Sequence, residues 1–348
     1  MRPGVAITGF GFLAASAAKQ ALDDGTSRPS PGTVEASGEA ANGSPRRLTR
    51  TLPEPLPRPT SWVCRPPRLA RLDRYSQVTF LAAHEAFRAA NLQEKPVAPE
   101  ALGMVLGTAY GCHAVNEEYY AGMVREGVRA ASPRLFTATL PSAPTGEMAI
   151  AFQAKGPALT LAHGWDAGLA AVAWAGRLCS GGKAKAVLAG GADILSDVLL
   201  TLLDEWALGI EPSEGAAFVV VEAAHEARER GATVRAMLLG TGAAFSPRPS
   251  GRDALERAIT AALRDAGLTA AAVRHAVVAQ APRSTDSQGR AHGRFGALPV
   301  DPASLYGTTF GAGGVLGIGM ALEALQGPTI VAAEDPLGSA SALVLGPA

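Results

Sequence analysis

Short, uninterrupted apolar runs alternate with segments of helical periodicity, and this alternation restricts the possible folds more than any other feature. Apolar runs at 104–107, 186–191 and 218–222 each end in glycine or a charged residue, as strands do. Residues 72–87 and 255–266 instead place apolar side chains at helical spacing. Strands that are apolar on both faces are typical of sheets covered on both sides. We therefore predict an α/β protein.

The same alternation continues over the rest of the chain. Further strands are expected at 159–161, 234–239, 275–279, near 330 and at 342–345, and further helices at 164–178 and 314–325. At the start, Val5-Ala6-Ile7-Thr8 predicts a short buried strand, and Gly9-Phe10-Gly11 predicts a turn after it.

Residues 28–67 break the pattern. This segment holds nine of the 25 prolines and keeps no hydrophobic period, so we predict a long loop. Between residues 46 and 74, eight arginines are opposed only by Glu54 and Asp73: Arg46, Arg47, Arg50, Arg58, Arg65, Arg68, Arg71 and Arg74. Two interpretations stay open, a solvated loop and a docking patch for an acidic partner.

The charge balance limits the choice of partners. With 31 basic and 31 acidic residues the formal net charge is zero, so no overall field attracts nucleic acid or anionic lipid. No strongly apolar run reaches the roughly 18 residues that span a bilayer. The three cysteines, Cys64, Cys112 and Cys179, are far apart and imply neither a disulfide framework nor a zinc site. We expect a cytoplasmic protein that binds neither nucleic acid nor membranes.

Generic cofactor motifs fail on their spacing. Gly181-Gly182-Lys183 is followed by Ala184 instead of Ser or Thr, which argues against a phosphate loop. The glycines of 311–319 lack the dinucleotide spacing after a strand. Cys112 and His113 are adjacent and point opposite ways on an extended chain. We therefore expect no cofactor and no metal.

A collinear series of motifs resembles the β-ketoacyl synthases of the thiolase fold. The series covers nearly the whole chain: Val5–Gly11, Arg71–Gln77, Ser132–Phe136, Gly156–Gly168, Ala189–Asp193, Glu214–Glu222 and Gly307–Gly314. The resemblance implies two pseudo-repeated α/β halves that form a layered α-β-α-β-α sandwich. We expect these halves at residues 1–245 and 246–348.

The resemblance also shows which catalytic groups are missing. Where the family reads A-C-x-[ST]-G this sequence reads Gly164-Trp165-Asp166-Ala167-Gly168, so Trp165 stands at the nucleophile position. Gln280 and Thr308 stand at the two histidine positions and Ala303 at the lysine position. An indole offers no lone pair for acyl transfer, and Thr and Gln do not titrate near neutrality. Condensation by this chain alone is therefore not expected.

The family includes a member type with this character, the chain-length-factor subunit of type II polyketide synthases. The resemblance implies a heterodimer with a catalytic ketosynthase, to which an acidic acyl carrier protein delivers substrate. It places Leu159 on the strand that pairs across the dimer. It places the end of the product tunnel in the region from Tyr110 to Leu140, with Met123 and Phe136.

Two other functions stay open. The chain could be a non-enzymatic scaffold or an acyl-binding homodimer. It could also be an enzyme with new chemistry, with His163 beside Asp166 as a general base. Against the second, we expect a strand or helix to scatter His163, Trp165 and Asp166.

Overall fold

The computed structural model describes residues 4–16, 30–31, 33–36, 48–65, 69–247, 252–279 and 299–348. Nine strands form one mixed sheet in the order β10-β11-β12-β9-β1-β8-β7-β5-β6, with β2 beside the end of β1. Their bounds are β1 Val5–Ser16, β2 Ser30–Pro31, β5 Leu102–Thr108, β6 Ala158–Ala162, β7 Ala186–Asp193, β8 Gly215–Ala223, β9 Ala236–Phe245, β10 His275–Ala279, β11 Thr329–Glu334 and β12 Ser339–Gly346. Strand β5 runs parallel to β6 and β7, β10 runs parallel to β11, and the pairings from β7 through β8, β1, β9 and β12 to β11 are antiparallel.

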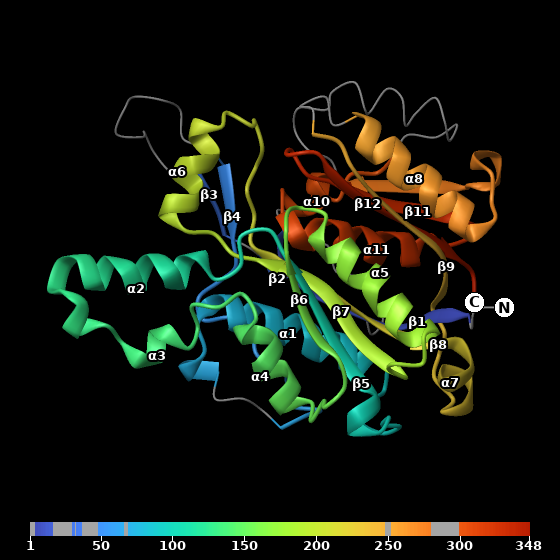
Figure 1. Cartoon of the computed structure of the whole chain (residues 1–348), viewed down its shortest axis with the longest axis horizontal. Helices are drawn as coiled ribbons and strands as arrows, with labels where there is room; N and C mark the ends of the chain where they lie inside the picture. The colour runs from blue at the N-terminus through green and yellow to red at the C-terminus, as the bar shows by residue number, and fades with distance from the viewer. Residues whose placement is uncertain are drawn as a thin grey trace.

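Helices cover both faces of this sheet (Figure 1). Their bounds are α1 Arg74–Ala89, α2 His113–Glu126, α3 Pro133–Phe136, α4 Ala143–Ala151, α5 Ala167–Ser180, α6 Asp197–Glu205, α7 Ala224–Glu229, α8 Arg252–Ala266, α10 Ala303–Tyr306 and α11 Gly313–Glu323. Helix α1 packs on β1, β7 and β8, and α8 packs on β9, β11 and β12. Helices α5 and α11 contact each other and lie between the two parts of the sheet. The layers therefore follow the expected α-β-α-β-α order.

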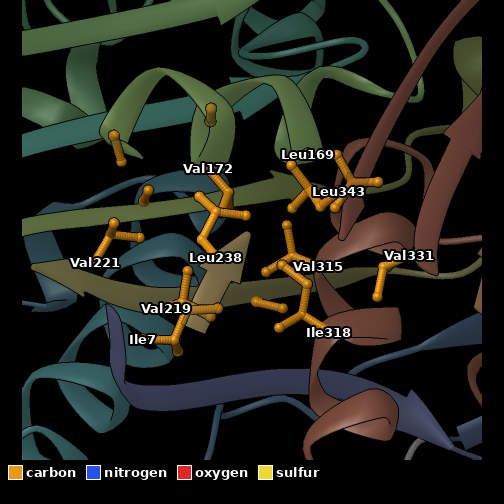
Figure 2. Close-up of a cluster of buried hydrophobic side chains, with 14 of the residues drawn as sticks. Ile7, Leu169, Val172, Val219, Val221, Leu238, Val315, Ile318, Val331 and Leu343 are labelled. Atoms are coloured by element: carbon orange, nitrogen blue, oxygen red, sulfur yellow. The ribbon is translucent and has the colours of Figure 1, made fainter. Parts of the chain in front are cut away.

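Strand β8 shows why the sequence contains uninterrupted apolar runs. Val219 and Val221 point into the central core with Leu169 of α5 and Val315 of α11, as Figure 2 shows. Phe218 and Val220, which alternate with them, point into a second core under α1. Because successive side chains of a strand face opposite ways, a strand between two cores must be apolar at every position.

The predicted turn at Gly9-Phe10-Gly11 is wrong. Strand β1 continues through these residues to Ser16, with a bulge between Ile7 and Gly9. A Cβ at Gly9 or Gly11 would overlap the backbone of Ala86, so these glycines let α1 pack directly on the strand.

The expected long loop at 28–67 contains local structure where the structure describes it. Strands β3 (Thr33–Ala36) and β4 (Leu48–Thr51) pair antiparallel. Residues 28–29, 32, 37–47 and 66–67 lie outside the described residues. Arg50 of β4 is buried and ion-paired with Glu211 at 2.7 Å.

The division at residue 245 stays a prediction. Strand β9, which precedes that boundary, pairs with β12 along most of its length and with β1 only at Val5–Ile7, so it joins the two parts of the sheet. Among the helices that the structure describes, none has both the length and the apolar character that crossing a bilayer requires.

Candidate functional site

Trp165 fills the turn that joins β6 to α5. Its side chain is 5% exposed, and its indole Nε1 donates to the Tyr110 hydroxyl at 3.0 Å. The Phe310 ring meets Trp165 edge to face at 5.2 Å between centroids and meets Tyr110 in the same way at 5.0 Å. Burial raises the pKa of Tyr110 to about 12. We call these three residues the aromatic cluster.

The structure brings three of the four substituted family positions together. Trp165, Ala303 and Thr308 line one cavity of about 20 Å³, which has room for roughly a single water molecule. Thr309 also lines it, and its buried Oγ1 has no hydrogen-bond partner among the described residues. The fourth position, Gln280, lies outside the described residues. The aromatic cluster leaves no room here for an acyl chain.

Two carboxylates surround the start of α5. Asp166 is 2% exposed and accepts from the hydroxyls of Ser339 and Ser341 at 2.6 and 2.7 Å. Asp335 accepts from the backbone N–H of Trp165 at 2.9 Å and from that of Leu337 at 2.7 Å. Burial raises the pKa of Asp335, and the nearby charge of Asp166 adds to the effect.

His163 and Asp166 are close, contrary to the expectation that they would be scattered. His163 Nδ1 lies 3.7 Å from Asp166 Oδ1, because the turn after β6 folds the chain back before α5 begins. The order is nevertheless wrong for nucleophile activation. A catalytic histidine must lie between the hydroxyl and the carboxylate, whereas here Ser339 donates directly to Asp166. The enzyme alternative finds no activated nucleophile in this group.

Asp193 holds the aromatic cluster in place. Its buried carboxylate accepts from Thr108 Oγ1 and from the backbone N–H groups of Ala109, Tyr110 and Gly311, at 2.7 to 3.0 Å. Asp193 thereby links the turn that contains Tyr110 to Gly311, the residue after Phe310. Complete burial raises the pKa of Asp193 despite these four donors.

Strand β6 is an edge of the described sheet. It pairs with β5 on one side, and most of its residues are exposed or half-buried, including Leu159 at 37%. Helices α2 and α3 project from the body of the molecule beside α4 (Figure 1). Large apolar side chains are exposed on these helices, on the segments that join them and on α5: Tyr120, Val124, Val128, Phe136, Leu140, Ile150 and Trp174. We call this set, with Leu159, the edge surface.

The residues expected at the tunnel end, Tyr110, Met123 and Phe136, lie in different surroundings. Tyr110 belongs to the aromatic cluster. Met123 is half-buried on α2, and Phe136 on α3 is 60% exposed, with its ring 6.0 Å from that of Tyr119.

The arginine-rich segment is partly used inside the protein. Arg50 binds Glu211, and Arg74 binds Glu214 at 2.7 Å. Arg58, Arg65 and Arg71 are exposed, while Arg46, Arg47 and Arg68 lie outside the described residues. In the part of the chain that the structure describes, no group of three or more His, Cys, Asp or Glu side chains is placed to hold a metal ion.

Comparison with known proteins shows what this chain is similar to. Residues 57–201 match the model of the β-ketoacyl synthase N-terminal domain. This part of the chain is similar to the β-ketoacyl synthases. The chain is 34% identical over 198 residues to a putative polyketide β-ketoacyl synthase 1 of Streptomyces halstedii, covering 49% of this chain and 47% of the relative. It is 27% identical over 224 residues to the 3-oxoacyl-[acyl-carrier-protein] synthase 2 of Staphylococcus aureus, covering 57% of this chain and 55% of the relative. The chain thus spans about half the length of the curated relatives that it matches.

Solved structures show the β-ketoacyl synthase fold over the whole chain. The ishigamide ketosynthase/chain length factor superimposes with a TM-score of 0.83 at 20% identity, and all of both chains is covered. A type II PKS acyl-carrier protein in complex with its ketosynthase contains a chain that superimposes with a TM-score of 0.81 at 15% identity, again with full coverage. A β-ketoacyl synthase from Burkholderia phymatum gives 0.83 at 20% identity and covers 99% of this chain. The expected thiolase-like fold is confirmed.

Sequence reasoning missed two residues of this site. Phe310 lies inside the recognised Gly307–Gly314 motif, but its positive φ of 49° and its contact with Trp165 are not visible in the sequence. Asp335 lies 170 residues after Trp165, and no periodicity links the two.

Proposed function

We propose that this chain is a non-catalytic, chain-length-factor type subunit that pairs with an active ketosynthase in type II polyketide or related acyl-chain biosynthesis. The observation that carries the proposal is the filled nucleophile turn beside an uncovered sheet edge. The turn lacks the groups that acyl transfer needs, and the edge has the groups that association needs.

No thiol of this chain substitutes for the missing nucleophile. Burial raises the pKa of Cys64 and Cys179 to about 12 and also raises that of Cys112. A thiol is nucleophilic as the thiolate, so all three are poor nucleophiles at neutral pH. None of the three lines the cavity at Trp165.

The backbone of β6 is oriented for pairing with another strand. Met104 N–H donates to Pro157 C=O at 2.8 Å. Because backbone groups alternate sides along a strand, Leu159 and Leu161 direct theirs toward β5. Ala158, Thr160 and Ala162 direct theirs toward the open side. An exposed strand edge of this kind is a template for another chain.

The edge surface supports a partner of the same fold. Apolar side chains are exposed on α2, α3, α4 and α5, of which α4 and α5 contact β6, and exposed apolar patches mark interaction sites. A second copy of this chain would bring no nucleophile, whereas an active ketosynthase would. A ketosynthase/chain length factor is among the structures that share this fold.

The partner would supply the catalytic cysteine and histidines, and an acidic acyl carrier protein would deliver the substrate to the complex. The exposed Arg58, Arg65 and Arg71 are available for such a protein, and one structure of the same fold holds an acyl-carrier protein with its ketosynthase. Tyr110, Met123 and Phe136 are the positions proposed to limit product length. A bulky substitution such as Met123→Trp should change the product distribution and leave the complex intact.

Co-expression with candidate ketosynthases, followed by size measurement and acyl-product analysis, tests the assignment. Ala162→Pro deletes one outward N–H of β6 and should weaken the complex at least about tenfold, whereas Ala162→Ser keeps the N–H and should not. A stable monomer that ignores every ketosynthase tested, or a homodimer that excludes them, would favour the scaffold alternative.

A further inference from the structure

A carboxylate of the chain itself binds the backbone N–H of Trp165, in the turn before α5. Trp165 N–H donates to Asp335 Oδ2 and Leu337 N–H donates to Asp335 Oδ1, at 2.9 and 2.7 Å. Pro336, which follows Asp335, has no N–H. The Asp335 residue is only 6% exposed, so solvent has little access to these hydrogen bonds.

Gly164 makes room for this carboxylate. Its φ is +144°, and a Cβ at this position would lie 2.7 Å from Asp335 Oδ2. The family pattern has alanine here, whose Cβ would displace the Asp335 side chain. Gly164 and Asp335 therefore form a matched pair on either side of the Trp165 amide.

We propose that Asp335 is a built-in occupant of the amide site at position 165, a second block that is independent of the indole. The backbone N–H of a nucleophilic residue at a helix start is a usual donor to the oxygen that becomes negative during acyl transfer. Here that N–H already binds a negative group, which would also repel a developing oxyanion or a thiolate. The inference deepens the non-catalytic part of the proposed function and is independent of the partner.

Other charged groups lie near, but their contacts differ. Asp166 is bound by Ser339 and Ser341 and faces His163. Asp301 and Glu334 line the cavity beside Trp165, and Asp301 Oδ1 accepts from Ala303 N–H at 2.9 Å. Within the described residues, Asp335 is the acidic side chain that binds the Trp165 amide. Asp301, a carboxylate that lines the cavity beside Trp165 without binding the Trp165 amide, therefore provides a matched control.

The test introduces a thiol at position 165 and measures its alkylation by iodoacetamide against pH, with peptide mass mapping. In Trp165→Cys the thiol should be unreactive at neutral pH and inactive in condensation. Adding Asp335→Asn should increase its alkylation rate at pH 7 at least about tenfold, which corresponds to a pKa lower by about one unit. Adding Asp301→Asn should change the rate much less. Equal rates with and without Asp335→Asn, or an equal gain from Asp301→Asn, would overturn the proposal. Wild-type protein reports the background from Cys64, Cys112 and Cys179.

A second measurement needs no substitution at Trp165. In protein labelled with ¹⁵N-tryptophan, the Trp165 backbone amide should shift as Asp335 titrates, with a midpoint above the usual aspartate range, and this titration should vanish in Asp335→Asn. A Trp165 amide that does not respond to pH, or that responds equally in Asp335→Asn, would contradict the assignment. Loss of ketosynthase binding would affect neither readout, so the two proposals fail separately.

Discussion

Strand β6 and Trp165, in the turn between β6 and α5, are only a few residues apart, yet they differ in exposure and in hydrogen bonding. Residues 158–162 are largely exposed, and within the described sheet they pair on one side only. Trp165 is buried under Tyr110 and Phe310, and its indole N–H and backbone N–H are both bound. Under the proposed function, strand β6 is the surface used for assembly, and Trp165 closes the pocket that acyl transfer requires.

The largest effect on stability is expected at Trp165. Trp165→Ala should lower the free energy of unfolding by about 3–5 kcal/mol, because it removes a large buried side chain and leaves a cavity among Phe310, Tyr110 and Leu203. Chemical denaturation of the isolated chain measures this. A change below about 1 kcal/mol would show that the turn is not packed as described.

Removing a single hydroxyl from the aromatic cluster should have a smaller effect. Tyr110→Phe leaves the Trp165 indole N–H without its acceptor, which should lower the free energy of unfolding by about 1–3 kcal/mol. Tyr119→Phe on α2 is the matched control, since the Tyr119 hydroxyl makes no hydrogen bond within the described residues, and it should have almost no effect. Equal losses in the two variants would mean that the bond to Trp165 does not stabilise the cluster.

The raised pKa of Asp335, which binds the Trp165 amide, gives a third, pH-dependent effect. The pKa of Asp335 is raised in the folded chain, so the folded state holds this proton at pH values where the unfolded state has lost it. Its contribution to stability therefore decreases as pH rises from the usual aspartate range through the raised pKa. The Tm of Asp335→Asn should therefore rise relative to the wild-type Tm as the pH increases across that interval. A Tm difference that stays constant with pH would contradict the raised pKa.

Substitutions on the edge surface should have the smallest effect on the stability of the isolated chain. Phe136→Ser removes an exposed ring and should change the free energy of unfolding by no more than about 0.5 kcal/mol. In the complex it should weaken ketosynthase binding. Phe245→Ser provides the control, because Phe245 is equally exposed at 58% but lies on β9, away from β6 in the sheet. Equal binding by the two variants would place the interface elsewhere.

The sequence predicted the strands and helices because their signals are local, whereas the layered order came from the family resemblance. The apolar run at 218–222 and the helical spacing at 255–266 each mark one element, and the structure places β8 and α8 there. The turn at Gly9-Phe10-Gly11 was wrong because a glycine in a strand and a glycine in a turn look alike without the neighbouring helix. Contact with Ala86 decides between them.

The site was predictable only where a motif fixed the register. Trp165, Ala303 and Thr308 were placed by the family pattern, and they line one cavity. The partners of Trp165 were not predictable, because Tyr110 and Asp335 come from elements 55 and 170 residues away. Gln280 stays a prediction, as it lies outside the described residues.

The most direct test of the central claim is intact-mass analysis of both subunits in a condensing complex. The complex is supplied with malonyl and acyl carrier substrates, and each subunit is weighed for covalent acyl groups. We expect the acyl group on the partner ketosynthase alone, no acylation at Cys64, Cys112 or Cys179 of this chain, and no condensation by this chain in isolation. Stoichiometric acylation of this chain, or condensation without a partner, would contradict the account.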